Sequence, residues 1–202
     1  MQEDLISLEN VRETSRIELL MSILPERVGS LLSLNNLRSD LDVAFETADS
    51  WIEILERLYF CYRIQPYGLP QLRAAKKERK LYLWDWSEIG NPSARFENLV
   101  ASQLLKYCHY HEDVEGYRME LRFLRDSQKR EIDFIVLKQG KPQFGVECKS
   151  GETSISDRIA YFAPRIPVPR FYQVHLGKRD YENPKLRARV LPFTTFAHEL
   201  CV

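Results

Sequence analysis

The sequence lacks the features of secreted, membrane-spanning and zinc-binding proteins. Residues 1–10 have neither the basic flank nor the apolar run of a signal peptide, and no segment approaches the roughly eighteen apolar residues of a membrane span. The four cysteines are scattered, without a C-x-x-C pair or a histidine at zinc-ligand spacing. These absences predict a soluble cytoplasmic protein with reduced thiols and no contact with a membrane.

Internal repeats and low-complexity tracts are also missing, so charge and hydrophobic periodicity must reveal the organisation of the chain. The formal net charge is zero, which alone says nothing about nucleic-acid binding. However, the first 60 residues contain five Arg and twelve Asp or Glu, out of 29 basic and 29 acidic residues in all. This asymmetry indicates either two modules with different partners, of which only the second suits a polyanion, or two ordinary surfaces of opposite sign.

The segment 15–86 has the order of elements expected of a winged helix. Apolar residues at helical spacing and a polar cap predict three helices, and two aromatic and β-branched runs predict the strands of a wing. The helices are predicted over residues 17–24, from Ser33 or Asn35 to Leu41, and over 45–58, and the strands over 59–65 and 80–84.

The helix predicted over 45–58 would read DNA in a winged-helix protein, but its charges oppose that role. Its acidic residues are Glu46, Asp49, Glu53 and Glu56, against the single Arg57. Such a surface repels phosphate, so we expect a protein or interdomain partner rather than a transcription factor's DNA contact. The wing is basic instead. Its residues expected to touch a nucleic-acid backbone are Arg73, Lys76, Lys77, Arg79 and Lys80.

A second domain is predicted over residues 87–202, with 1–14 left as an N-terminal tail. An asparagine cap followed by proline predicts a helix over 93–107. The later strands are predicted over 120–125, 131–137, 143–148 and 170–176, with a short helix over 155–162. This order predicts an α/β layer with a mixed sheet.

The two strands around a turn near Gly140 contain the residues of chemical interest. If this hairpin is symmetric about Gly140, Asp133 lies opposite Glu147 and Glu131 lies opposite Lys149. Because side chains alternate between the faces of a strand, all four charged side chains are expected on one face. Two opposed carboxylates with Cβ atoms roughly 5 Å apart destabilise a sheet unless a cation lies between them.

This arrangement predicts a Mg²⁺ or Mn²⁺ site. Magnesium takes a few carboxylate oxygens together with water and a substrate phosphate, so Asp133, Glu147 and the backbone carbonyl of Cys148 would suffice. Lys149 would orient or help to deprotonate a water and offset charge on the scissile phosphate. Alternatively, Lys149 pairs with Glu131, and the two other carboxylates line a solvated sheet face.

The order of these motifs resembles the PD-(D/E)XK superfamily of restriction-endonuclease-like proteins. Glu97 in a helix, Asp133 in a strand and the run Glu147-Cys148-Lys149 match the superfamily's pattern. The runs 95–100, 123–126, 130–134 and 146–150 resemble the nuclease-like domain at the C-terminus of a family of prokaryotic AAA+ ATPases. In that family a winged-helix segment precedes the domain, as it would here.

The resemblance implies a restriction-endonuclease-like mixed sheet flanked by helices, and metal-dependent cleavage of DNA. Glu97, Asp133, Glu147 and Lys149 would form the catalytic set, with Glu97 as an indirect or second metal ligand. The chain has no G-x-x-x-x-G-K-[ST] motif and therefore no ATP site of that kind, so it resembles a C-terminal part or a stand-alone relative of such an ATPase. Because the fold also has inactive members, the alternative is a nuclease-like interaction or regulatory module, which would contact an ATPase domain or another protein through the acidic winged-helix segment.

Overall fold

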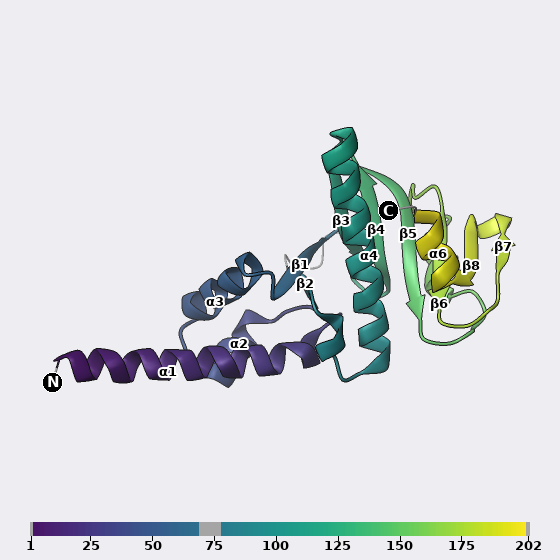
Figure 1. Ribbon diagram of the computed structural model, residues 1–202. Coiled ribbons are helices and arrows are strands. Elements are labelled where there is room, and N and C mark those ends of the chain that lie inside the picture. The colour runs from purple at the N-terminus through teal and green to yellow at the C-terminus, as the bar shows by residue number, and fades with distance from the viewer. Residues whose placement is uncertain (1, 69–77, 201–202) are drawn as a thin grey trace.

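The computed structural model describes residues 2–68 and 78–200, with side chains from residue 13 onwards. It has a mixed α/β fold, in which helices flank a twisted eight-stranded sheet and the long first helix extends away from it (Figure 1). The predicted α/β class is therefore confirmed. In chain order the elements are α1 (Gln2–Ile23), η1 (Leu24–Arg27), α2 (Leu34–Leu41), α3 (Phe45–Arg57), β1 (Cys61–Pro66), β2 (Lys80–Leu83), η2 (Trp86–Glu88), α4 (Pro92–Glu115), β3 (Met119–Arg125), β4 (Glu131–Lys138), β5 (Lys141–Lys149), α5 (Asp157–Phe162), β6 (Phe171–His175), β7 (Tyr181–Asn183), η3 (Pro184–Leu186), β8 (Ala188–Pro192) and α6 (Phe193–Leu200).

The helices before the sheet form largely where periodicity and capping predicted them. The Ser33 side chain accepts a hydrogen bond from the backbone N–H of Asn36 and so caps α2, which ends at Asp42 in a left-handed conformation. In α3 the residues at helical spacing, including Trp51 and Ile52, are buried. Only α1 differs clearly, because it begins at Gln2 rather than near residue 17. None of the described helices has the length and apolar character needed to cross a membrane.

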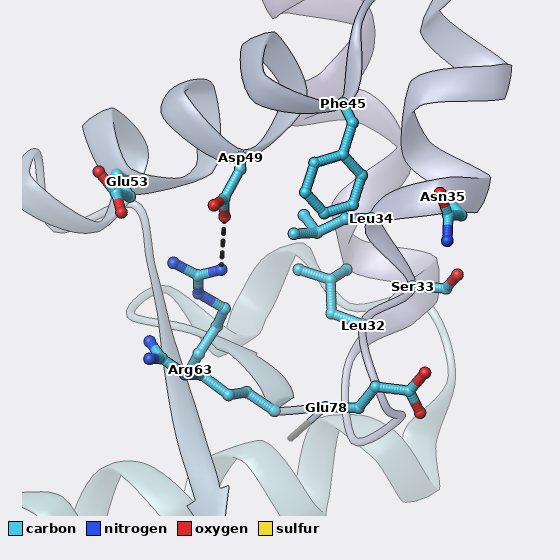
Figure 2. Close-up of a pocket in the computed structure, with 10 residues that line it drawn as sticks. Leu32, Ser33, Leu34, Asn35, Phe45, Asp49, Glu53, Arg63 and Glu78 are labelled. Atoms are coloured by element: carbon cyan, nitrogen blue, oxygen red, sulfur yellow. Dashed lines mark hydrogen bonds and ion pairs between the residues drawn. The ribbon is translucent and has the colours of Figure 1, made fainter. Parts of the chain in front are cut away.

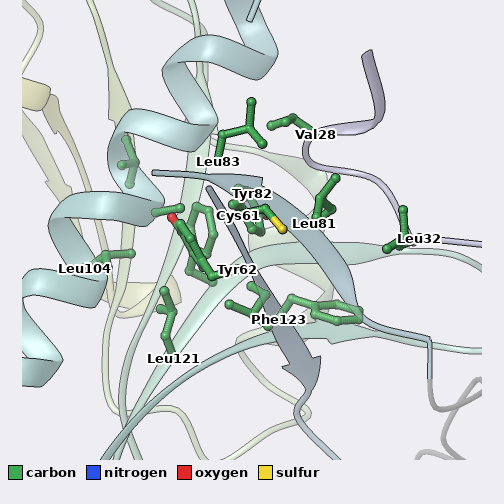
Figure 3. Packing of buried hydrophobic residues seen from close by; sticks show 14 of the residues in the cluster. Val28, Leu32, Cys61, Tyr62, Leu81, Tyr82, Leu83, Leu104, Leu121 and Phe123 are labelled. Atoms are coloured by element: carbon green, nitrogen blue, oxygen red, sulfur yellow. The ribbon is translucent and has the colours of Figure 1, made fainter. Parts of the chain in front are cut away.

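The two strands expected as a wing extend the large sheet. β1 pairs antiparallel with β2 and parallel with β3, so the strand order is β2-β1-β3-β4-β5-β6-β8-β7. Residues on both sides of the predicted boundary at 86 and 87 consequently belong to one hydrophobic cluster. Figure 3 shows part of this cluster, with Cys61, Tyr62, Leu81, Tyr82 and Leu83 beside Leu104, Leu121 and Phe123.

The two faces of the sheet pack against different helices. On one face, α4 and α6 form the larger cluster, to which β4 contributes Phe134 and Val136. On the other face, α5 forms a second cluster, to which β4 contributes Ile132, Ile135 and Leu137. The cluster that a side chain joins therefore identifies the face of the sheet on which it lies.

The β4–β5 hairpin has the predicted register only from Val136 to Phe134, and two deviations that offset each other produce it; the predicted pairs Asp133–Glu147 and Glu131–Lys149 lie beyond the last paired residues. Its loop is Gln139-Gly140, both at positive φ, so Lys138 pairs with Lys141 and the turn is centred between those loop residues. An unpaired extra residue, Gln143, then forms a β-bulge on β5. Beyond this bulge Val136 faces Phe144 and Phe134 faces Val146, as symmetry about Gly140 predicted.

The C-terminal part contains elements that the sequence did not predict. Strands β7 and β8 continue the sheet beyond β6, and α6 packs on the same face as α4. The predicted helix 93–107 also continues further, to Glu115, where Gly116 ends α4 in a left-handed conformation.

Candidate functional site

A second β-bulge lies in β4, at Asp133 and Phe134. Arg122 of β3 pairs with Ile135, whereas Leu124 pairs with Ile132, so β4 has one residue more than β3 in this interval. A bulge interrupts the alternation of side chains along its strand. Ile132 accordingly packs on the α5 face and Phe134 on the α4 face, although they are two residues apart.

The charged side chains predicted to share one face are divided between the two faces. Glu131 contacts Lys80 on the α4 face, with 2.6 Å between Oε1 and Nζ, and Arg125 at 2.8 Å. Glu147 contacts Lys149 on the α5 face, with 2.9 Å between Oε1 and Nζ. The prediction of a common face is wrong, because the bulge reverses the alternation between Glu131 and the rest of β4. The alternative pairing of Glu131 with Lys149 is not formed.

Asp133 lies where β4 and β5 separate, just beyond their last paired residues, Phe134 and Val146. Its Oδ2 accepts a hydrogen bond of 2.8 Å from the backbone N–H of Cys148 across this fork. Burial raises the pKa of the Asp133 carboxyl well above its usual range, and the carboxylates of Glu97 and Glu147 raise it further. Asp133 is thus close enough to both of the other acidic residues that the PD-(D/E)XK pattern selects to be repelled by them.

Glu147 is the most deeply buried of these acids, with no solvent-exposed surface. Its Oε1 accepts from Lys149, from Arg158 Nη1 at 3.2 Å and from Ser156 Oγ at 3.4 Å. Its Oε2 is buried and has no hydrogen-bond partner among the described residues. An unpaired buried polar atom costs roughly 1–3 kcal/mol, and more when it belongs to a charged group, so a cation beside Oε2 would be stabilising.

Lys80 was predicted to touch a nucleic-acid backbone, and this is wrong because its side chain is only 2% exposed. Its ammonium lies 3.2 Å from Glu97 Oε1 and 2.6 Å from Glu131 Oε1. Although burial lowers the pKa of Lys80, the carboxylates of Glu97, Asp133 and Glu131 raise it above its usual value. Lys80 is therefore an internal cation of the candidate site.

Glu97 lies in α4 as predicted, but its partners come from the segment before it. The Tyr82 hydroxyl donates to Glu97 Oε1 at 2.8 Å, next to Lys80 on the same strand, β2. Gly29 lies against the carboxylate, since a Cβ atom there would be 3.1 Å from Oε1. Because Lys80 and Tyr82 are two residues apart on a predicted strand, the sequence could have placed both side chains on the same face.

Arg158 and Ser156 are further residues of the site that the sequence did not select. Ser156 caps α5 by accepting from the Arg158 backbone N–H at 3.2 Å, which places Arg158 in the first helical turn beside Glu147. The only sequence signal was a serine two residues before an arginine at the start of the predicted helix 155–162.

The residues proposed to touch nucleic acid are largely outside this site. Arg79 is exposed and lines a hollow of about 540 Å³ between α2, α3 and β1. Figure 2 shows this hollow and the ion pair between Asp49 and Arg63 on its wall. Arg63 also contacts Glu56 at 2.7 Å, so part of the negative charge of α3 is neutralised within the protein. Arg73, Lys76 and Lys77 lie outside the described residues.

The donor atoms of the candidate site suit a hard divalent cation, although they are not arranged as a complete cage. Among the described residues, no group of three or more His, Cys, Asp and Glu side chains has the arrangement of a metal site. However, Asp133 and Glu147 are buried carboxylates, and Glu147 Oε2 lacks a partner. Magnesium binds such oxygens together with water and phosphate, so these residues fit the predicted ion chemically.

Comparison with protein families gives two matches that together cover most of the chain. Residues 1–88 match the Domain of unknown function (DUF8612), and residues 93–196 match the Domain of unknown function (DUF4143). Comparison with curated proteins and with solved structures gave no match. Because the second match spans more than half of the 202 residues, the chain belongs to the family described as Domain of unknown function (DUF4143).

Proposed function

We propose that the chain contains a divalent-metal-dependent phosphodiesterase site that acts on DNA. The observation that carries the proposal is the buried, unpaired Oε2 of Glu147, close to a second buried carboxylate, Asp133. Two such acids are costly to bury without compensation. A cation that binds both would offset this cost, and it would lie next to Lys149.

In this proposal Asp133, Glu147 and the Cys148 carbonyl hold Mg²⁺ or Mn²⁺, and Glu97 is an indirect or second ligand. The metal, when bound, supplies Lewis-acid chemistry at the scissile phosphate. Lys149 orients a water and offsets negative charge on the phosphate, from its place beside Glu147. The Cys148 N–H keeps the Asp133 carboxylate in position across the fork between the strands.

A second candidate function is a catalytically inactive nuclease-like module that binds an ATPase or another cytoplasmic protein. It is favoured by the cations already present in the protein. Lys80 lies between Glu97 and Glu131, and Lys149 and Arg158 both contact Glu147. In this alternative these cations replace the metal, and the acidic surface of α3 contacts the partner.

Metal titration and DNA cleavage, measured together, test the first function against the second. Calorimetry with Mg²⁺ and Mn²⁺ should show binding to the wild type and to Lys149→Ala, but not to Glu147→Gln. Radiolabelled single- and double-stranded DNA should be cleaved only with metal, and Lys149→Ala should lose on the order of 10²-fold or more in rate. The exposed Glu182→Gln is the control and should behave like the wild type.

The two functions predict different combinations of these results. Metal binding without cleavage of either DNA form would support the inactive module. Absence of both metal binding and cleavage in the wild type would contradict the proposed phosphodiesterase, and full activity of Lys149→Ala would contradict the role given to that lysine.

A further inference from the structure

A groove lies between the end of α1 and the start of α4. It consists of two hollows of about 1110 and 340 Å³, which adjoin because both are lined by Phe60, Asp85 and Glu88. Sites for small molecules usually have volumes of roughly 300–1,000 Å³. The joined groove is therefore of a size that suits a polypeptide segment.

The charged residues that line this groove all have the same sign. Among its described lining residues the ionisable acids are Glu26, Asp85 and Glu88, all exposed, and neither lysine nor arginine occurs. Hydrogen bonds from the Ser87 side chain and backbone lower the pKa of Asp85, which keeps this carboxylate ionised. Such a groove repels phosphate and attracts lysine and arginine side chains.

Apart from Ser22, Gly90 and Asn91, the rest of the lining is apolar or aromatic, and one of its residues has a strained backbone. Tyr59 has a φ of 56°, which is uncommon for a residue with a side chain and costs on the order of 1 kcal/mol. This conformation leaves Tyr59 71% exposed, with its ring 5.4 Å from that of Trp84. Neighbouring Leu58 is also 70% exposed. Exposed rings beside carboxylates can bind cations through their faces.

We propose that this groove binds an amphipathic helical segment of another protein, on which lysine or arginine side chains lie beside aliphatic ones. Glu26, Asp85 and Glu88 pair with the cations, and Tyr59 and Trp84 contact their charged ends and aliphatic stems. The aliphatic side chains of the partner are buried against the apolar wall, which includes Met21, Val28 and Phe60. The partner is a polypeptide rather than a nucleic acid, because the groove's charge opposes phosphate. The proposal does not depend on metal binding.

Fluorescence anisotropy with a labelled amphipathic helix of about fourteen leucine and lysine residues tests this binding. The double variant Glu26→Gln/Glu88→Gln should weaken binding by about tenfold. The matched control Asp113→Asn/Glu182→Gln removes two exposed carboxylates, which line neither of the two hollows, and should leave the affinity within about twofold. An equal loss in both variants would show attraction by overall charge and would overturn the proposal.

Tyr59→Gly separates binding from folding. Glycine adopts positive φ without strain, so this variant should unfold at a temperature no lower than the wild type while binding the peptide several-fold more weakly. Unchanged affinity would overturn the role of the ring. A peptide with glutamate in place of lysine, a shuffled peptide of the same composition and single-stranded DNA serve as further probes. If any of these three bound at the groove as tightly as the first peptide, the proposed partner chemistry would be wrong.

Discussion

The two faces of the sheet differ in how their carboxylates are paired with cations. On the α4 face, Lys80 is almost completely buried between Glu97 and Glu131, and Arg125 also contacts Glu131, so both carboxylates have a cationic partner. On the α5 face, Glu147 is buried but its partners Lys149 and Arg158 are 30% and 47% exposed, and its Oε2 is unpaired. The first arrangement is closed and suits a structural role, whereas the second is open, because one carboxylate oxygen is left without a partner among the residues that the structure describes.

Removal of the buried cation should have the largest effect on stability. Lys80→Met leaves Glu97 and the buried Glu131 without their common partner, which we expect to cost about 3–5 kcal/mol of unfolding free energy. Lys149→Met removes a partly exposed cation and should cost about 1 kcal/mol or less. Urea unfolding of both variants measures the difference. Equal losses would show that the two faces do not differ in the way described.

Metal should stabilise the protein only through the open face. With Mg²⁺ or Mn²⁺ at a hundred times its dissociation constant, the wild type should gain about 2.7 kcal/mol. Glu147→Gln should abolish this gain, whereas Glu131→Gln should keep it despite a lower starting stability. Thermal unfolding with and without metal measures both. Loss of the metal response in Glu131→Gln would place the ion on the other face.

The stability conferred by Asp133 should fall as pH rises. Its carboxyl has a raised pKa in the folded protein, so the folded state binds a proton more tightly than the unfolded chain does, and ionisation above pH 4 disfavours folding. Asp133→Asn removes this penalty and keeps an oxygen for the Cys148 N–H. Without metal, its gain should be near zero at pH 4 and about 1–2 kcal/mol at pH 8. A gain that is independent of pH would contradict the assigned cause.

Deletion of Gln143 should have the smallest effect. This residue is unpaired, and removing it leaves Leu137 opposite Pro142 and Val136 opposite Phe144. The division of charges between the two faces arises at Asp133, so the deletion should cost about 1 kcal/mol or less and preserve the metal response. Denaturant unfolding and metal-dependent melting measure the outcome. Loss of the metal response would show that the Gln143 bulge, too, positions Glu147.

Local signals in the sequence predicted most of the helices and strands, but not the face of the sheet on which each charged side chain lies. Capping by Ser33 and Asn91 and the apolar spacing of α3 and α4 located these helices, because such signals act within a few residues. The hairpin register was predicted correctly between the pairs Val136–Phe144 and Phe134–Val146, since the position of the turn and the bulge offset each other. These successes concern contacts that are close in sequence.

The predictions that failed depended on contacts distant in sequence. The bulge at Asp133 is defined by pairing with β3, and strict alternation could not reveal it. Lys80 appeared within a basic run, but tertiary contact with α4 and β4 buries it. The strand β8 was missed because Arg189 interrupts its short apolar pattern, and its position depends on parallel pairing with β6. The burial and the partners of these charged side chains thus cannot be predicted until the pairing of all the strands is known.

The pairing of β1 with β3 has a consequence for how this molecule can be divided. A fragment limited to residues 93–196 would lose Lys80 and Tyr82, and with them every hydrogen-bond and ion-pair partner of Glu97 described above, as well as Gly29. It would also expose the edge of β3, which invites association with other chains. The Glu97 carboxylate therefore belongs to the second family segment, 93–196, but is held by residues of the first, 1–88. A change in either segment that moves these residues therefore alters the surroundings of Glu97.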